Sequence, residues 1–211
     1  MIDVEKLSKR HVYRIIKRIF DFIASLMGLI ILSPIFLIVA LGIKIDDFSG
    51  PIFYSQERVG RNGHKFKMIK FRSMFKDADQ KKDILIKSNE VEGAMFKIKD
   101  DPRITKFGKF IRKHSLDELP QLYNVLIGDM SLVGPRPPLA REVVKYSDFD
   151  KQRLLVQPGC TGLWQISGRS DLNFDEMVTL DLKYIKKSSI KYDLWIIMHT
   201  FIVFIKPNGA Y

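Results

Sequence analysis

A long uncharged stretch near the N-terminus constrains this chain most. Residues Phe22 to Ile43 carry no charged side chain, and their 22 positions approach the ~20 that an α-helix needs to cross a membrane. Pro34 lies near the middle of the stretch. It supplies no N–H, and its ring clashes with the carbonyl of Ile30, so we expect the helix to kink or break there. Ser33 can bond back to a freed carbonyl, which makes such a break tolerable in lipid.

The two halves and their flanks leave the path of this stretch open. At 1.5 Å per residue each half reaches only ~15–18 Å, about half of a ~30 Å hydrocarbon core. Basic residues lie on both sides of the stretch: Arg14, Lys17 and Arg18 before it, and Lys44, Arg58, Arg61 and Lys65 after it. The positive-inside rule therefore places both flanks in the cytoplasm, as in a re-entrant hairpin. Crossing helices also contain proline kinks, so the residues alone favour neither a re-entrant hairpin nor a single span.

The charge and cysteine content narrow the classes of protein. A chain of 211 residues predicts one compact domain with appendages. Its formal charge of +11 indicates an anionic partner, which leaves nucleic acid, anionic lipid and a phosphorylated substrate open. Cys160 is the only cysteine, which excludes an intramolecular disulfide and suits a reducing cytoplasm.

Two adjacent carboxylates, Asp117 and Glu118, lie between a basic segment and an apolar one. The basic residues before them share a helix face: Lys106, Lys109, Arg112 and Lys113. The apolar residues after them predict a buried helical stripe that ends near Gly128: Leu119, Leu122, Tyr123 and Leu126. Free N–H groups at the start of that helix could hold a phosphate beside the acids. A structural alternative is a capping box between Ser115 and Glu118.

The rest of the chain predicts short elements around this centre. Strands at Pro51 to Gln56 and His64 to Phe71 would form a basic hairpin through the Asn62-Gly63 turn. Residues 76 to 101 predict a surface helix and a loop. Two loops rich in glycine and proline present arginines, Arg136 in residues 128 to 138 and Arg169 in residues 157 to 169. Asn173 to Lys187 predicts an amphipathic helix, and Leu194 to Ile205 an apolar helix too short to span a bilayer.

Several separated motifs, in this order, resemble those of the monotopic phosphoglycosyl transferases, or bacterial sugar transferases. The resemblance runs from about Lys17 to Tyr211. Its landmarks are Lys17-Arg18-Ile19-Phe20-Asp21, Ser33-Pro34, Lys70-Phe71-Arg72-Ser73-Met74, Ser115 to Gln121, Val133 to Pro137 and Pro158 to Arg169. It implies that the Ser33-Pro34 break makes the membrane segment re-entrant. The expected fold is α+β and mostly helical, with that helix-break-helix, a small β-hairpin and amphipathic interface helices.

The resemblance also implies a division of the chain and of its chemistry. We expect a basic segment (1–18), a re-entrant membrane hairpin (19–45) and a cytoplasmic, membrane-associated catalytic domain (46–211). The family's activity implies transfer of a sugar-1-phosphate from a UDP-sugar to undecaprenyl phosphate, with hexose the expected sugar. By resemblance, Asp117 is the nucleophile and Glu118 a Mg²⁺ ligand, with both acids near the metal. The expected substrate-binding residues are Lys70, Arg72, Arg112, Arg136 and Arg169.

The expected partners are therefore the UDP-sugar, the polyprenyl phosphate and membrane lipid at the inner face of the cytoplasmic membrane. A homo-oligomer stays open, and nucleic acid is not expected. The alternative is a membrane-anchored basic protein that binds nucleic acid or anionic lipid. That alternative explains the charge and the anchor, but it does not explain adjacent acids at a helix start.

Overall fold

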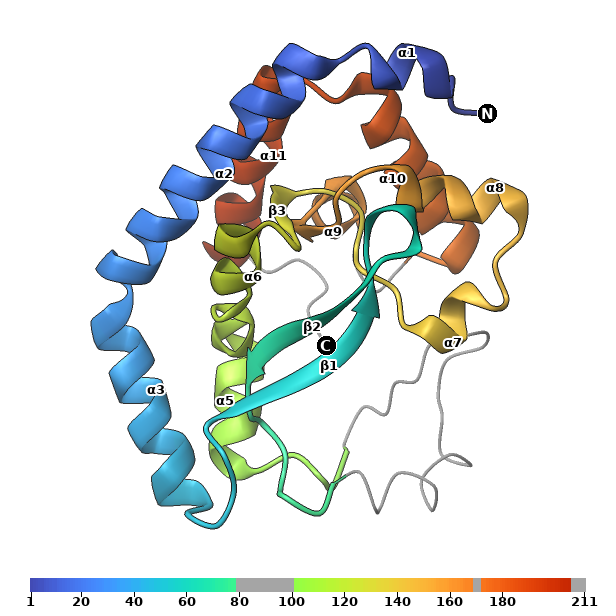
Figure 1. Ribbon diagram of the computed structural model, residues 1–211. Helices are drawn as coiled ribbons and strands as arrows, with labels where there is room; N and C mark the ends of the chain where they lie inside the picture. Colours follow the sequence, from blue (N-terminus) through green and yellow to red (C-terminus); the bar gives the residue numbers. More distant parts are fainter. Residues whose placement is uncertain (79–100, 169–171, 206–211) are drawn as a thin grey trace.

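The computed structural model describes residues 1–78, 101–168 and 172–205 (Figure 1). The described chain is mostly helical, which confirms the predicted class. Its helices are α1 (Val4–Ser8), α2 (His11–Ile31), α3 (Ser33–Asp46), α5 (Lys106–Lys113), α6 (Gln121–Ile127), α7 (Ala140–Val143), α8 (Asp148–Lys151), α9 (Leu163–Ser167), α10 (Phe174–Lys187) and α11 (Ile190–Ile205). Short 3-10 turns are η1 (Arg61–Gly63), η3 (Leu116–Glu118) and η4 (Gln152–Leu155). The strands are β1 (Phe53–Val59), β2 (Lys65–Phe71), β3 (Ser131–Val133) and β4 (Gly159–Thr161).

The predicted break in the apolar segment is present. Helices α2 and α3 meet at Leu32 and are bent by 59°, with Pro34 in the first turn of α3, where its missing N–H leaves no helical bond unmade. Within the described residues, neither helix alone has the length and apolar composition of a membrane span; only the bent pair taken together does. Helix α2 is continuous across the boundary expected between residues 18 and 19.

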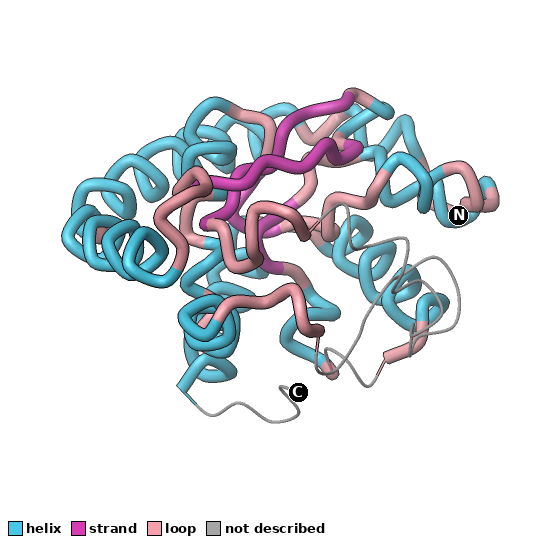
Figure 2. Tube along the Cα trace, turned by 90° about the horizontal axis from the view of Figure 1, so that it is seen from below, coloured by secondary structure: helices cyan, strands magenta, loops and turns pink. Residues whose placement is uncertain are grey.

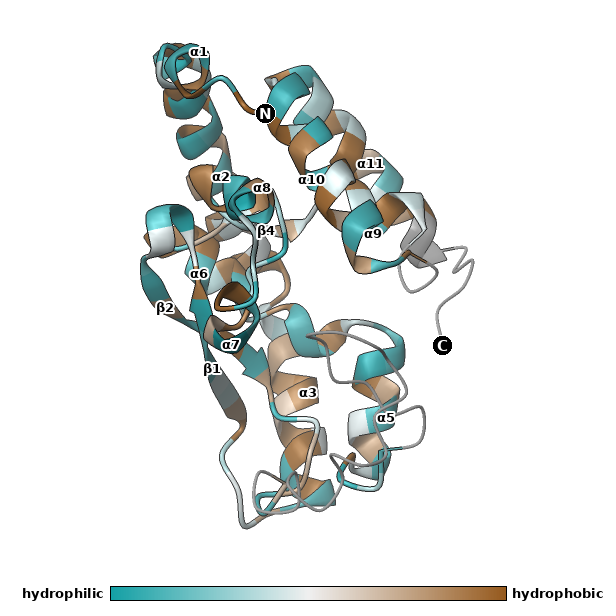
Figure 3. Cartoon of the chain, turned by 90° about the vertical axis from the view of Figure 1, so that its right-hand side faces the viewer, coloured by the Kyte–Doolittle hydropathy of each residue, from teal (hydrophilic) through white to brown (hydrophobic). Residues whose placement is uncertain are grey.

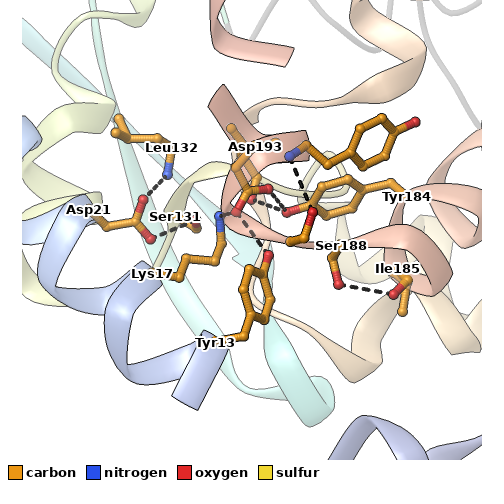
Figure 4. A network of polar contacts seen from close by, with 12 residues as sticks. Tyr13, Lys17, Asp21, Ser131, Leu132, Tyr184, Ile185, Ser188 and Asp193 are labelled. Carbon is orange, nitrogen blue, oxygen red and sulfur yellow. Dashed lines mark hydrogen bonds and ion pairs between the residues drawn. The ribbon is translucent and has the colours of Figure 1, made fainter. Parts of the chain in front are cut away.

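Helix α2 is docked on the rest of the chain through a line of polar contacts (Figure 4). Lys17 donates to the buried carboxylate of Asp193 in α11 over 3.0 Å, and the Tyr13 hydroxyl donates to the same oxygen over 2.9 Å. Asp21, one turn further along α2, accepts from the Ser131 hydroxyl at 2.7 Å and from the Leu132 N–H at 3.1 Å. One face of α2 is thus fixed to α11 and to β3.

Both ends of the bent pair attach to the same body of the molecule. Just before α2, the guanidinium of Arg10 donates to the carbonyl oxygens of Ile185 and Lys186 at the end of α10, over 3.2 and 2.9 Å. At the other end, the Asp46 carboxylate accepts from the N–H of Phe107 in α5 at 2.9 Å. The pair therefore forms an arch that bends along one side of the globular part, with its inner face packed on α6 and α5 (Figure 1).

The outer face of this arch is apolar and exposed. Large apolar side chains with more than a third of their surface exposed occur along both helices: Ile16, Ile19, Phe22, Ile23, Met27, Ile30, Ile31, Leu37, Ile38 and Leu41. Helix α11 adds Trp195, Met198 and Phe201. In Figure 3 helix α3 is drawn mostly in the brown of hydrophobic residues. Apolar patches much larger than a few hundred Å² mark contact with a membrane or a partner, so this surface fits the predicted interface helices.

The predicted hairpin is formed. Strands β1 and β2 pair antiparallel, and Asn62 (φ 55°) and Gly63 (φ 82°) take left-handed conformations at the turn, as an Asn-Gly turn requires. Strand β1 extends to Val59, beyond the expected end at Gln56. Figure 2 shows the strands in magenta; most of β1 is exposed to solvent. Phe66 and Met68 of β2 pack with Val125 of α6 and Met130 in a small core.

The predicted stripe on α6 is confirmed only in part: the helix ends at Gly128 as expected, but Leu119, Leu122 and Leu126 are half-buried rather than buried. The buried residues of this helix are Gln121, Asn124 and Val125, whereas Tyr123 is 46% exposed. Hydrogen bonds of Asn124 explain which face of α6 is buried. Its side-chain amide accepts from the N–H of Ile69 at 2.9 Å and donates to the carbonyl of Lys67 at 2.8 Å. Asn124 thereby completes the free edge of β2, and it turns the leucine face toward the arch.

The two glycine-rich segments are also more regular than predicted. Ser131–Val133 and Gly159–Thr161 are short strands that pair in parallel, and Trp164 lies on helix α9 rather than in a loop. A Cβ on Gly159 would lie 2.0 Å from the nitrogen of Gly134, so the glycines there allow two backbones to touch. The predicted helices at 173–187 and 194–205 are confirmed as α10 and α11. The segment expected at 76 to 101 lies almost entirely outside the described residues.

Candidate active site

The adjacent acids lie in the 3-10 turn η3, which joins α5 to α6. Ser115 before the turn takes the left-handed conformation (φ 53°), which ends the regular geometry of α5. Its side chain makes no cap hydrogen bond, so the capping box considered from the sequence is not formed. Glu118 therefore does not have the structural role that a capping box would have given it.

Glu118 is paired with a distant residue of the hairpin. The ammonium of Lys70 in β2 lies 2.6 Å from the Glu118 carboxylate, and the two side chains are 25% and 46% exposed. Removal of water by the surrounding protein raises the pKa of Glu118, but the charge and hydrogen bond of Lys70, with the charges of Arg136 and Arg58, outweigh it and lower the pKa. Glu118 is consequently an ionised carboxylate facing several cations.

Asp117 has the opposite electrostatic character. It is only 8% exposed. Burial raises its pKa to about 6, the neighbouring charge of Glu118 adds to the increase, and the charges of Lys70 and Arg112 oppose it. The two adjacent acids thus differ: Asp117 is buried and its pKa is raised, whereas Glu118 is partly exposed and its pKa is lowered. Divergent pKa values of this kind are common where two carboxylates perform different chemical roles.

The structure brings Lys70, Arg112 and Arg136 to the dyad, although it places them on three different elements. Arg112 lies in the last turn of α5, where its Nε donates to the hydroxyl of Ser73 over 2.8 Å. Arg136 follows β3 and reaches the buried Glu142 carboxylate at 3.3 Å, with 31% of its side chain exposed. Arg112 acts electrostatically on Asp117, and Arg136 acts on Glu118.

Arg58 is a residue of this site that the sequence analysis missed. It was counted only as a basic flank of the membrane segment, yet its charge lowers the pKa of Glu118. Its side chain is 8% exposed and donates to the carbonyl of Pro137 over 3.0 Å, which ties strand β1 to the loop that carries Arg136. Burial and the neighbouring Arg136 charge lower the pKa of Arg58 to about 10. In the sequence, only its position near the end of a predicted strand could have indicated that Arg58 belongs to the site.

Two of the expected substrate-binding residues are not seen at the dyad. Arg72 is buried, forms an ion pair with the Asp47 carboxylate, and donates to the Asp47 carbonyl at 2.6 Å, so it holds the chain that leaves α3. Arg169 lies outside the described residues. A further small cavity beside Arg136 is lined by Glu142, Tyr146, Arg153, Trp164, Phe174 and Met177. The indole N–H of Trp164 is buried there without a hydrogen-bond partner among the described residues.

The donor set suits a hard divalent cation. Within the described ranges no group of three or more His, Cys, Asp or Glu side chains is placed to hold a metal by itself. Mg²⁺ is usually bound through one or two carboxylates together with substrate phosphates. Asp117 and Glu118 provide two carboxylates, and the cations around them would balance the charge of a phosphate.

Comparison with known proteins agrees with this geometry. Residues 12–207 match the family described as "Bacterial sugar transferase". The chain is 51% identical to "Galactosyl transferase CpsE" of Streptococcus agalactiae over 95% of this chain and 44% of that protein. It is 46% identical to "Undecaprenyl-phosphate galactose phosphotransferase" of Salmonella typhimurium over 94% of this chain and 42% of that protein.

A shorter relative is "Exopolysaccharide production protein ExoY" of Sinorhizobium fredii, which is 42% identical over 92% of this chain and 88% of that protein. The chain thus spans less than half the length of the first two relatives and most of the length of the third. Since the family match covers nearly the whole sequence, including the bent helix pair and the dyad, the chain belongs to the bacterial sugar transferase family.

Proposed function

We propose that this chain transfers a hexose-1-phosphate, glucose or galactose, from a UDP-sugar to undecaprenyl phosphate and releases UMP. The reaction would begin the synthesis of an exopolysaccharide, a capsule or a related glycan. The names of relatives support the substrate classes: one is an "Undecaprenyl-phosphate galactose phosphotransferase" and another a "UDP-galactose-lipid carrier transferase". The observation that carries the proposal is the buried, comparatively basic Asp117 beside the Lys70–Glu118 ion pair.

The reaction proceeds in two displacements at one phosphorus atom. An oxygen of the Asp117 carboxylate attacks the phosphorus that bears the sugar, the bond from this phosphorus to the UMP oxygen breaks, and UMP leaves with the electron pair. The enzyme then holds the sugar phosphate as an acyl phosphate. A phosphate oxygen of the lipid attacks the same phosphorus and expels the carboxylate, which regenerates Asp117. Covalent catalysis of this kind divides one difficult transfer into two easier ones.

The different environments of the two acids support different roles for them. A pKa near 6 leaves Asp117 ionised at neutral pH, while its burial removes the water that would otherwise solvate and weaken a nucleophile. Glu118 is accessible and ionised, which suits a ligand of Mg²⁺. Asp117 and Glu118 would hold Mg²⁺, and the bound ion would offset the negative charge of the donor diphosphate.

The surrounding cations would bind the donor and stabilise the departing UMP. The charge of Lys70 acts on both acids, that of Arg112 acts on Asp117, and those of Arg58 and Arg136 act on Glu118. Charge-assisted hydrogen bonds from guanidinium groups to phosphate are short and directional. The cavity beside Arg136 has a volume of about 10 Å³, room for one water molecule, and contains the buried indole N–H of Trp164.

The bent helix pair would place this site at the cytoplasmic face of the membrane. Both ends of the pair bind the same globular body, through Arg10 on one side and Asp46 on the other. A segment that crossed the bilayer would separate those contacts by the full hydrocarbon thickness of ~30 Å. The exposed apolar outer face of the arch would instead enter one leaflet, so that the dyad meets a lipid phosphate at headgroup level.

The first prediction concerns the covalent step. Labelled UMP should exchange into UDP-galactose or UDP-glucose in the presence of Mg²⁺ and the absence of polyprenyl phosphate, because the first displacement is reversible without an acceptor. Asp117→Asn should lower the exchange rate by roughly a thousandfold or more, since an amide of similar size is a poor nucleophile. The exchange is measured as label recovered in the purified sugar nucleotide.

Two variants control that experiment. Glu118→Gln should weaken the metal site, and higher Mg²⁺ should recover part of its activity, whereas Asp117→Asn should not respond. Asp148→Asn removes an exposed acid from α8 and should leave the exchange unchanged. If wild-type enzyme completes the full transfer but shows no acceptor-free exchange, Asp117 is not a nucleophile and the dyad is a metal site. A basic membrane protein that binds nucleic acid or lipid would release no UMP at all.

The second prediction follows from the pKa of Asp117, measured without Mg²⁺. The folded pKa of about 6 exceeds the ordinary 3.8, so the native state binds more protons than the unfolded state between these values. Ionisation of Asp117 therefore costs stability as the pH rises from about 4 to 6. Asp117→Asn should remove this cost, and its advantage over wild type should grow across that window to at most about 3 kcal/mol at pH 7. Urea unfolding at several pH values measures it.

Glu118→Gln provides the matched control of opposite sign. Because the Glu118 pKa is lowered in the folded protein, its ionised form stabilises the fold above the unfolded pKa, and that contribution is lost as the pH falls through the folded value. Glu118→Gln should therefore be less stable than wild type at pH 7 and approach it in acid. An Asp117→Asn advantage that does not change with pH would mean that the buried carboxylate is not the cause.

The third prediction concerns the path of the membrane segment. In a background with Cys160 replaced by serine, single cysteines in place of Ser8, before the arch, and Lys145, in the globular body, should both resist an impermeant thiol reagent added to intact cells. Both should react once the cells are opened, since both positions are exposed in the structure. Labelling of only one of them in intact cells would require a true span and would contradict the re-entrant arrangement.

A further inference from the structure

An open basic groove lies at the start of α2, where no residue of the dyad or of its neighbouring cavity contributes. Its volume is about 360 Å³, and it is lined by His11, Arg14, Ile15, Arg18 and Ile19 of α2 and by Arg61 of the hairpin turn. That volume is within the ~300–1,000 Å³ of ordinary small-molecule sites. The proposed transfer reaction uses none of these residues.

Two of the arginines are held in place by neutral acceptors. Arg14 donates to the carbonyl of Ser8 over 3.0 Å and contacts a ring nitrogen of His11 at 2.9 Å. Arg18 donates to the carbonyls of Val125 and Leu126 at the end of α6, over 2.6 and 2.7 Å. Each guanidinium is therefore oriented, and neither forms an ion pair with a carboxylate in the part of the chain that the structure describes. Lys17, which lies between them in the sequence, is by contrast neutralised by Asp193 at 3.0 Å.

The third guanidinium comes from another element. Arg61 begins the left-handed Asn62-Gly63 turn, is exposed, and forms no ion pair with any residue that the structure describes. None of the six residues that line the groove is acidic. Three guanidinium groups and one imidazole thus converge on an open space with no counter-charge from its walls, which favours an anion with several acceptor oxygens.

The rest of the wall is apolar. Ile15 is 61% exposed and Ile19 is 54% exposed, and both lie on the same groove as the arginines. The apolar surface continues along α2 through Phe22 and Ile23 toward the break. A free inorganic anion would gain nothing from this surface, whereas a phosphate that carries acyl chains would cover it.

We propose that this groove binds an anionic phospholipid of the surrounding membrane. Its phosphate is held between Arg14, Arg18 and Arg61, and an acyl chain lies over Ile15 and Ile19. The lipid would fix the N-terminal end of the arch at headgroup level and join α2 to the tip of the hairpin. This role differs from donor or acceptor binding at the dyad and does not depend on the transfer reaction.

The test measures lipid binding to the full purified chain in detergent without any activity readout. Short-chain phosphatidylglycerol is titrated while the midpoint of thermal unfolding is followed, since a ligand of the native state raises it. Phosphatidylcholine with the same acyl chains tests whether a net negative charge is required. Inorganic phosphate tests whether acyl chains are required. Farnesyl phosphate tests whether the groove prefers a phosphate that carries an isoprenoid chain. Wild type should be stabilised by phosphatidylglycerol at concentrations where the other three have little effect.

Arg61→Gln is the main variant, because Arg61 is exposed and its loss should not disturb the fold. Its apparent affinity for phosphatidylglycerol should fall about fivefold, the usual effect of one basic residue near an anionic lipid surface. Adding Arg14→Gln should lower it by a similar factor again. Lys145→Gln removes the same charge from another exposed position and should bind as wild type does.

The contradicting results are distinct. Equal losses in Arg61→Gln and Lys145→Gln would show a diffuse effect of net charge rather than a site. Equal stabilisation by inorganic phosphate would assign the groove to a free anion, and tighter binding of farnesyl phosphate that depends on Arg61 would assign it to the acceptor. Stabilisation by phosphatidylcholine equal to that by phosphatidylglycerol would remove the charge requirement. Any of these outcomes overturns the proposal.

Discussion

The rest of the structure depends on the docking of α2 through polar side chains on one face. Three residues of a single turn and a half bind three separate parts of the fold: Lys17 binds Asp193 in α11, Arg18 binds carbonyls at the end of α6, and Asp21 binds β3. The buried Lys17–Asp193 ion pair adds little net stability, because the cost of removing water from the two charges offsets their attraction. The three contacts fix the rotation of α2 about its axis, and that rotation decides which apolar residues face outward.

The docking of α2 also determines where the candidate active site lies. Helix α6 follows the dyad directly, and its end is held by Arg18. At its other side the Asn124 amide joins α6 to the edge of β2, the strand that carries Lys70. The Lys70–Glu118 pair is thus supported by the arch, the helix and the hairpin together. A displacement of the arch in the membrane would be transmitted to the dyad through these contacts.

Local patterns in the sequence predict the elements well and their mutual contacts poorly. The break at Pro34, the Asn-Gly hairpin and the last two helices follow from proline chemistry, turn chemistry and periodicity, which act within a few residues. The buried face of α6 could not be predicted in this way. Its orientation is set by hydrogen bonds between Asn124 and a strand more than fifty residues away in the sequence.

The site shows the same division. The adjacent acids and the arginines of the motifs are visible in the sequence, but their environments are not. That Asp117 is buried while Glu118 is paired with Lys70 depends on how the turn η3 faces the hairpin. Arg58 could not be recognised from the sequence, because the residues around it resemble those at the end of any strand. Arg72 forms an ion pair with Asp47, although its motif suggested that it binds a phosphate. The left-handed conformation of Ser115 likewise could not be predicted from helix-capping rules.

The central claim is that Asp117 forms a bond to phosphorus, and mass spectrometry of the enzyme tests it most directly. Enzyme mixed with Mg²⁺ and UDP-sugar, without lipid acceptor, is quenched in acid and weighed intact, and its peptides are then sequenced. The account predicts an increase equal to one hexose phosphate less one water, the mass of the transferred hexosyl phosphoryl group, located on Asp117, removed by hydroxylamine and absent from Asp117→Asn. An enzyme that transfers sugar phosphate to lipid while never carrying this mass, or carrying it on another residue, would contradict the account.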